Sequence, residues 1–212
     1  NGNIANAPEL RRQLLAKGLG LMTGSDSELL AMMLAGTPGT CWIERIAEAM
    51  RSWIGAYSLV ILTREGVFAI RDPWGFRPLA WGKIDSGGWA LASETSALRV
   101  MGCSEIHEIS PGEIMHFSEK GILETRRADI DVPHASCSFE YVYFSRPDSV
   151  WNGRNIHAVR RKTGEILAEE APAIADLVIP VPDSSIPAAI GYAQRSGIPF
   201  GEGLVKNRYI GR

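Results

Sequence analysis

Several features are scarce in this 212-residue sequence, and each scarcity excludes a class of protein. Cysteine occurs only at Cys41, Cys103 and Cys137, an odd and widely spaced set that fits a reducing compartment better than a disulfide scaffold. The formal net charge of -2 provides no basic stripe of the kind that binds nucleic acid. No apolar run reaches the roughly 18 residues of a membrane helix, and no signal-peptide pattern occurs. We therefore expect a cytoplasmic protein that binds neither nucleic acid nor a membrane.

What the sequence does contain is typical of globular domains. Hydrophobic residues make up 45% of the chain and charged residues 22%, which is enough apolar surface for a sizeable core. The length fits one large domain or two small ones. The chain begins at Asn1 without methionine and stops at Arg212 soon after an extended segment. On that basis we expect an internal fragment of a longer protein.

The first part of the chain has a helical pattern that changes to a strand pattern. Apolar spacing and end signals predict helices over residues 8–18, 27–34 and 42–53. One short helix is expected over residues 94–100, among short strands that begin at Tyr57. The predicted strands are 57–62, 67–71, 79–81, 89–92, 106–109, 113–117 and 122–125. This order predicts an α+β domain of layered sheets and helices over residues 1–132.

The second part, residues 133–212, has a parallel α/β pattern. A buried strand is expected at Phe139–Phe144, then a helix at Asn155–Glu170. An apolar run at 177–181, a polar loop, a helix at 186–195 and an extended segment at 198–205 then form a strand–loop–helix–strand unit. In such units the ligand binds at the carboxyl end of the strand, beside the helix N-terminus.

Three stretches are candidate binding sites. Asp183-Ser184-Ser185 suits a phosphate or a Mg²⁺-bound phosphate, with a simple helix cap as the alternative. A backbone N–H at Gly2 and the amide of Asn1 make a competent oxyanion hole, although Asn-Gly is more often only a turn or a strand end. Residues 206–212 carry three cations, which suit either a pyrophosphate clamp or a solvated loop.

Asp26 stands at the start of the second predicted helix, where two roles are open. Its side chain is either an N-cap or a free carboxylate that receives the ammonium group of a ligand. Ser25 is the other candidate cap, and Ser25 with Glu28 has the spacing of a capping box.

Together these motifs resemble the amidophosphoribosyltransferase family. Four stretches resemble the later part of a class II glutamine amidotransferase domain, of N-terminal-nucleophile type. They are Asn1–Ile4, Thr23–Glu28, Asp72–Leu79 and Ala92–Glu94. More specific matches lie at Cys137–Ser149, Val181–Ser185 and Lys206–Arg212. The resemblance implies that the α+β domain is followed by the first part of a type I phosphoribosyltransferase domain with a parallel sheet. Trp74 departs from the family pattern, which usually has a histidine there.

The resemblance also implies a reaction. The family transfers the amide nitrogen of glutamine to phosphoribosyl pyrophosphate, the first committed step of purine synthesis, and releases glutamate and pyrophosphate. Asn1 and Gly2 are implied as the oxyanion hole, and Asp26 as the group that binds the glutamine ammonium. Ser184 is implied as a Mg²⁺ ligand. Lys206 and Tyr209 are implied as parts of a lid over phosphoribosyl pyrophosphate.

Further expectations concern cofactors, partners and activity. The resemblance leaves open an iron–sulfur cluster with Cys137 as one ligand, and it implies purine nucleotides as feedback inhibitors and a homotetramer. No residue at the start of the chain can be the family's N-terminal cysteine nucleophile, and the loop that binds ribose phosphate has no counterpart up to Arg212. This fragment alone is therefore expected to be inactive in both half-reactions.

Two alternative functions belong to different classes. One is another class II glutamine amidotransferase, such as glucosamine-6-phosphate synthase or an asparagine synthetase, which has an Asn-Gly but lacks the Pro-Asp-Ser-Ser loop and the lid. The other is a non-catalytic relative that keeps the fold and binds nucleotide.

Overall fold

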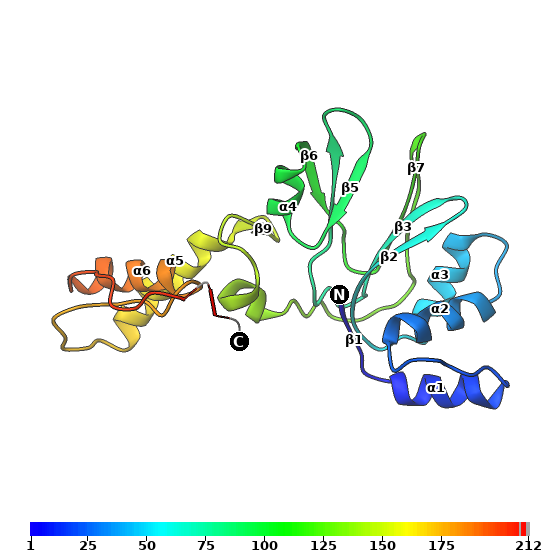
Figure 1. Cartoon of the computed structure of the whole chain (residues 1–212), viewed down its shortest axis with the longest axis horizontal. Helices are drawn as coiled ribbons and strands as arrows, with labels where there is room; N and C mark the ends of the chain where they lie inside the picture. Colours follow the sequence, from blue (N-terminus) through cyan, green and yellow to red (C-terminus); the bar gives the residue numbers. More distant parts are fainter. Residues whose placement is uncertain (208, 211–212) are drawn as a thin grey trace. The chain divides into compact units, whose positions relative to one another are not determined.

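The computed structural model describes residues 1–207 and 209–210. The chain divides into two compact units, Asn1–Ser136 and Cys137–Arg212 (Figure 1). The predicted boundary after residue 132 lies just before this division. Among the described residues, no helix combines the length and the apolar character that crossing a membrane requires.

Three helices open the first unit and share one hydrophobic core. They are α1 (Ala7–Ala16), α2 (Asp26–Gly36) and α3 (Trp42–Met50), close to the predicted ranges. Leu10, Leu29 and Ile46 point into the core and are almost fully buried. Each buried side chain of this size contributes roughly 1.5–3 kcal/mol, so burial of these side chains stabilises this layer more than helix propensity does.

Two antiparallel sheets complete the first unit. The larger has the order β1-β2-β3-β7-β8, and the smaller β5-β4-β6. The strands of the larger sheet are β1 (Gly2–Ile4), β2 (Gly55–Thr63), β3 (Gly66–Arg71), β7 (Glu113–Ser118) and β8 (Gly121–Arg127). The smaller sheet, with helix α4 (Thr95–Val100), consists of β4 (Ala80–Ile84), β5 (Trp89–Ala92) and β6 (Cys103–Glu108). This arrangement agrees with the predicted α+β architecture.

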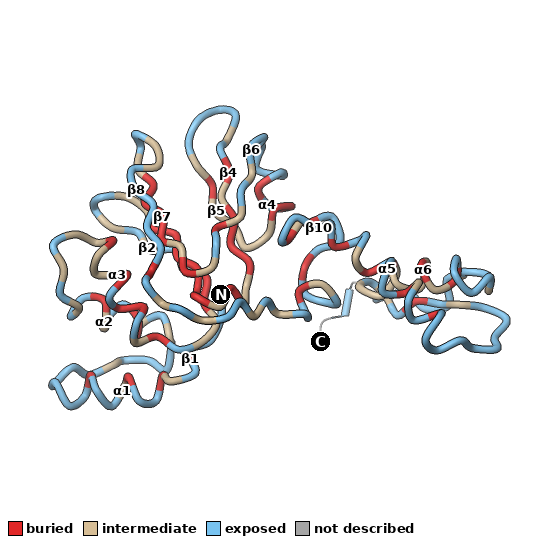
Figure 2. The backbone as a smooth tube through the Cα atoms, turned by 180° about the vertical axis from the view of Figure 1, so that it is seen from behind, coloured by how far each residue is buried: buried red, intermediate tan, exposed pale blue. Residues whose placement is uncertain are grey.

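The centre of the larger sheet, at β3 and β7, is buried on both faces. Along β3, Phe68 and Ile70 join the core shared with the helices, whereas Ala69 between them joins a second core. That second core also contains Met115 and Phe117 of β7, with Trp81 of the smaller sheet packed against it. Successive residues of a strand face opposite sides, so the alternation shows that helices cover one face and the smaller sheet the other. Figure 2 shows these buried positions concentrated along β7 and its neighbouring elements.

The second unit contains the two predicted helices and two very short strands. The helices are α5 (Ile156–Glu170) and α6 (Ile186–Ser196), and the strands are β9 (Val150–Trp151) and β10 (Arg154–Asn155). Asn155 caps α5 by accepting a hydrogen bond from the N–H of Ala158. Gly197 ends α6 in the left-handed conformation, a common C-terminal cap.

The predicted buried strand at Phe139–Phe144 is wrong. The segment forms a π-helix, η1 (Glu140–Phe144), and the side chains of Phe139 and Phe144 are exposed. Glu140 is buried and accepts a hydrogen bond from the Ser145 hydroxyl at 2.7 Å. Arg160 of α5 donates to the carbonyls of Tyr141 and Ser145 at 2.5 and 2.7 Å. These contacts with a distant helix hold the segment in a helical turn despite the strand propensity of its aromatic residues.

The predicted strands at 177–181 and 198–205 are also wrong as strands. Between them the structure forms one isolated parallel bridge, Val178 with Phe200. The N–H of Val178 donates to the Pro199 carbonyl at 2.8 Å, and the N–H of Gly201 donates to the Val178 carbonyl at 3.0 Å. Ile179 and Leu204 remain exposed, and within the described residues no third strand covers them. An isolated two-stranded pair is marginal, so the parallel sense is as expected but the predicted sheet is not formed.

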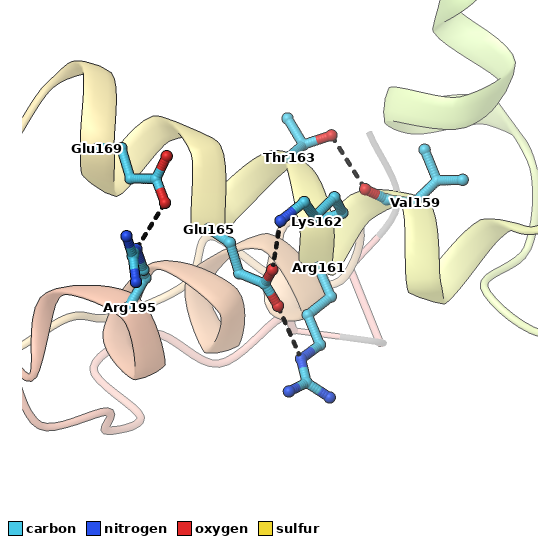
Figure 3. Close-up of polar contacts among 7 residues, drawn as sticks. All are labelled: Val159, Arg161, Lys162, Thr163, Glu165, Glu169 and Arg195. Carbon is cyan, nitrogen blue, oxygen red and sulfur yellow. Dashed lines mark hydrogen bonds and ion pairs between the residues drawn. The ribbon is translucent and has the colours of Figure 1, made fainter.

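Helices α5 and α6 approach closely because each has a glycine at their contact. A Cβ on Gly164 would lie 1.8 Å from the Ala188 carbonyl oxygen, and one on Gly191 would lie 2.0 Å from the Arg161 carbonyl oxygen. Beside this contact, Arg195 of α6 pairs with Glu169 of α5 at 2.6 Å, as Figure 3 shows. That pair is half-exposed and contributes little, so backbone proximity is the main constraint.

Replacing Gly164 by alanine is expected to destabilise the chain by about 1–3 kcal/mol, the range found for overpacked sites. In a helix interior, alanine in place of glycine normally raises the free energy of unfolding by about 1 kcal/mol. Here we expect that free energy to fall instead. Urea denaturation measures it, with Thr163→Ala as the control because Thr163 is adjacent but exposed. If Gly164→Ala is as stable as the control, the close contact is not real.

Candidate functional site

Asn1 and Gly2 lie at the start of β1, beside β2. The N–H of Ser58 donates to the Asn1 carbonyl at 2.8 Å, and the Asn1 backbone nitrogen donates to the Ser58 carbonyl at 3.1 Å. Gly2 pairs with Tyr57 at a φ of 128°, and a Cβ there would lie 1.9 Å from the Ala56 carbonyl oxygen. Only glycine fits this approach without displacing the strand. The Asn-Gly dipeptide is therefore a strand start, not a free turn.

Asp26 is the first residue of α2, and it is not the helix cap. Ser25 caps the helix by accepting a hydrogen bond from the Ser27 N–H at 3.2 Å. Asp26 is half-buried, and its Oδ2 accepts a hydrogen bond from the Ile4 N–H at 3.0 Å. Within the described residues Oδ1 has no hydrogen-bond donor. The carboxylate is therefore fixed to β1 by one oxygen while the other remains available.

A cavity of about 110 Å³ joins these residues. Its lining includes Asn1, Gly2 and Asp26, together with Leu30 and Leu59. Asp26 carries the only charged side chain among the described residues that line it. An amide side chain and a backbone N–H can donate to a developing oxyanion, and a carboxylate can accept from an ammonium. The cavity therefore suits a small ligand that has both an amide carbonyl and an ammonium group.

Asp72 bonds to β2 at Tyr57, the residue that pairs with Gly2. Its Oδ2 accepts from the Tyr57 N–H at 3.3 Å, and its Oδ1 accepts from the N–H groups of Gly75 and Phe76 at 2.8 and 3.3 Å. Burial raises the pKa of Asp72, while these N–H groups and the charge of Arg71 act in the opposite direction. The loop that Asp72 closes thus holds β2 at the residue that pairs with Gly2.

Two residues near the site have roles that the sequence did not indicate. Glu28 has capping-box spacing from Ser25, yet its carboxylate accepts from the N–H groups of Met22 and Thr23 and from the Thr23 hydroxyl. Arg11 of α1 donates to two carbonyls of the same loop. The spacing predicted that Glu28 would form a capping box with Ser25, whereas Glu28 bonds to Met22 and Thr23. Nothing in the sequence indicated the role of Arg11.

In the second unit, the loop before α6 and the following extended segment share another cavity. Its volume is about 410 Å³, and its lining includes Asp183, Ile186 and Lys206. Lys206 Nζ lies 3.7 Å from Asp183 Oδ2. Ser184 is half-buried next to this lining but does not belong to it, and Tyr209 is fully exposed. Of the predicted residues, Lys206 thus lines this cavity, whereas Ser184 and Tyr209 do not. Residues 208, 211 and 212 of the predicted lid lie outside the described residues.

Comparisons with known proteins find similarity along both units of the chain. A family profile described as a glutamine amidotransferase domain matches residues 1–100. Amidophosphoribosyltransferase of Synechococcus elongatus is 46% identical over 217 residues, and that of Mus musculus 43% over 237 residues. Both alignments include 100% of this chain, with 44% of the first relative and 45% of the second. The chain belongs to the amidophosphoribosyltransferase family.

A solved structure of the same kind has nearly the same backbone. Glutamine phosphoribosylpyrophosphate amidotransferase from B. subtilis, in complex with ADP and GMP, matches with a TM-score of 0.94 at 40% identity. The match covers 100% of this chain and 46% of that one. The chain therefore spans somewhat less than half the length of the relatives that it matches. Because the similarity continues through both units, it does not favour the other class II amidotransferases.

The iron–sulfur cluster with Cys137 as one ligand stays a prediction, because the described residues include no complete ligand set. Such a cluster generally needs four cysteine ligands. Cys137 is half-buried at the start of the second unit, whereas Cys41 and Cys103 belong to the first unit. Among described residues, no three His, Cys, Asp or Glu side chains gather to hold a metal ion. Trp74 also has no position in either cavity lining; its ring lies 6.0 Å from that of Phe76.

Proposed function

We propose that the whole protein is an amidophosphoribosyltransferase. It transfers the amide nitrogen of glutamine to phosphoribosyl pyrophosphate and forms 5-phosphoribosylamine, glutamate and pyrophosphate, the first committed step of purine biosynthesis. The supporting observation is the cavity that joins Asn1, Gly2 and Asp26, in a chain 46% identical over its full length to a protein of that name. Residues 1–132 serve the glutamine half-reaction, and residues 133–212 the phosphoribosyl transfer.

In the glutamine half-reaction, Asp26 orients the substrate and Asn1 with Gly2 stabilises the charge. The available Oδ1 of Asp26 accepts from the α-ammonium of glutamine. When a nucleophile supplied elsewhere in the whole protein attacks the amide, negative charge develops on the carbonyl oxygen. The Gly2 N–H and the Asn1 amide donate to it, and each such donor contributes roughly 3–4 kcal/mol in comparable sites.

In the transfer half-reaction, the loop before α6 receives the pyrophosphate group with its Mg²⁺. The Ser184 hydroxyl would supply an oxygen ligand to the ion, because Mg²⁺ commonly takes one or two protein ligands and completes its shell with phosphates and water. The N-terminus of α6 adds favourable polarity for an anion. The Lys206 ammonium exchanges its ion pair with Asp183 for one with the pyrophosphate. Tyr209 is part of the lid that excludes water.

Regulation, assembly and location are proposed on the same family resemblance. The B. subtilis structure holds ADP and GMP, which supports purine nucleotides as feedback inhibitors of this protein too. A homotetramer in the cytoplasm is the corresponding assembly and location.

Replacing Ser184 by alanine is expected to raise the KM for phosphoribosyl pyrophosphate roughly tenfold, because one oxygen ligand to a charged group is lost. Titration with Mg²⁺ and substrate measures it. Ser185→Ala is the matched control, since the Ser185 hydroxyl donates to the Val181 carbonyl. Unchanged kinetics of Ser184→Ala would remove Ser184 from the Mg²⁺ site.

An omission assay on the full-length protein tests the proposed function itself. Pyrophosphate release should require phosphoribosyl pyrophosphate, Mg²⁺ and a nitrogen source, either glutamine or ammonia, all together. Release without a nitrogen source would contradict it. Nucleotide binding with no turnover would establish the non-catalytic alternative.

A further inference from the structure

Arg11 of α1 makes two hydrogen bonds to the loop that leads into the candidate glutamine site. Its Nη1 donates to the Thr23 carbonyl at 3.0 Å, and its Nη2 donates to the Ser25 carbonyl at 2.9 Å. A planar guanidinium can hold two acceptors at once in a fixed geometry, which a lysine cannot do. Both carbonyls belong to the three residues that precede Asp26, so the contact fixes the backbone at the entrance to α2.

That loop has few other restraints. Between Lys17 and Ser25 every residue except Leu21 is exposed, and Met22 is 94% exposed. Gly24 has no heavy atom within 4 Å of where its Cβ would lie. A segment with so few buried apolar contacts moves readily, so polar contacts have to define its position.

Glu28 holds the same loop from the α2 side. Its Oε1 accepts from the Met22 N–H at 2.8 Å, and its Oε2 accepts from the Thr23 N–H and hydroxyl at 2.7 and 2.6 Å. The Thr23 hydroxyl first, and then these N–H groups, lower the pKa of Glu28. The loop is thus fastened on one side by α2 itself, and on the other by Arg11 of a separate helix.

We propose that Arg11 is a positioning residue for the Asp26 carboxylate. Glu28 belongs to the same helix as Asp26, so it cannot orient that helix relative to the rest of the site. Arg11 links the entrance of α2 to α1, which follows directly after β1 and therefore after Asn1 and Gly2. It acts together with the Ile4 N–H on Asp26 Oδ2. Arg11 itself is outside the cavity lining and does not contact the ligand.

This inference rests on the proposed function, since it concerns the binding of glutamine by the same site. A small displacement of a positioning contact can reduce rates up to about a hundredfold. Losing Arg11 should therefore raise the KM for glutamine about tenfold, with little change in kcat. Ammonia bypasses the glutamine site, so ammonia-driven activity should stay within about twofold of wild type.

The test compares Arg11→Ala, Arg11→Lys and Arg12→Ala in the full-length protein, with glutamine and with ammonia. Arg12 is the matched control, because it is the next residue of α1 and its guanidinium pairs with Glu9 of the same helix. Arg11→Lys should be intermediate, since it restores one donor but not the fork. Ammonia-driven activity confirms that each variant is folded.

Three results would overturn the proposal: a glutamine KM for Arg11→Ala equal to that of Arg12→Ala, an equal loss with both nitrogen sources, or full rescue by lysine. These outcomes differ from failure of the proposed function, in which the wild-type protein itself shows no glutamine-dependent release of pyrophosphate. The expected result is a rise in glutamine KM confined to the Arg11 variants.

Discussion

Replacing Gly2 by alanine is expected to reduce glutamine-driven activity by about 100-fold or more, the loss typical of removing one oxyanion donor. The added Cβ would lie 1.9 Å from the Ala56 carbonyl oxygen, at a φ of 128° that alanine rarely adopts. The start of β1 would have to separate from β2. The Gly2 N–H and the adjacent Asn1 amide would then both leave their positions.

Steady-state kinetics with glutamine and with ammonia measure this effect. Ammonia-driven activity should be largely retained, because it does not use the oxyanion hole. Gly18→Ala is the matched control, since Gly18 also has a positive φ of 79° but no heavy atom within 4 Å of its Cβ position. A Gly2→Ala variant with near-wild-type use of glutamine would show that Gly2 has no part in the oxyanion hole.

Replacing Asp26 by alanine is expected to lower kcat/KM for glutamine about 100-fold, because a hydrogen-bonded charge partner of the ammonium is lost. Asp26→Asn separates the two roles of the side chain. Asparagine keeps an oxygen for the Ile4 N–H, but it carries no charge. If charge recognition dominates, both variants should lose glutamine use by similar factors while ammonia-driven activity is spared.

Two results would show that Asp26 has only a structural role. If glutamine and ammonia suffer alike, or if asparagine restores full activity, the carboxylate serves only to connect α2 with β1. Thermal unfolding, run beside the kinetics, would then show destabilisation of Asp26→Ala, which lacks the bond to the Ile4 N–H, and little change in Asp26→Asn, which keeps it.

The first unit was largely predictable because its signals are local. The apolar stripes of α1 and α3, the end signals of α2 and the alternation along β3 depend on neighbouring residues. The structure places these elements close to the predicted ranges. The second unit departs from prediction where distant contacts decide. Phe139–Phe144 has strand-like residues, yet Arg160 holds their carbonyls in a π-helix. A parallel pair at Val178 and Phe200 depends on further strands for its extension.

The sequence indicated candidate site residues, but it did not indicate how they are arranged. The motifs named Asn1, Gly2 and Asp26, whereas their common cavity became evident only from the structure. Asp26 could have been a cap or a free carboxylate, and the fold gives the cap to Ser25. Arg11 was not predictable, because its contact with the loop depends on how α1 packs. Ser184 and Tyr209 stay predictions, since neither lines the cavity near Lys206.

The proposed function assigns glutamine hydrolysis and phosphoribosyl transfer to one whole protein. The most direct measurement is the ratio of glutamate to pyrophosphate produced by the full-length protein with glutamine, phosphoribosyl pyrophosphate and Mg²⁺ all present. We expect one glutamate for each pyrophosphate, with both products depending on phosphoribosyl pyrophosphate. Glutamate production without pyrophosphate release, or pyrophosphate release that does not depend on glutamine or ammonia, would contradict it.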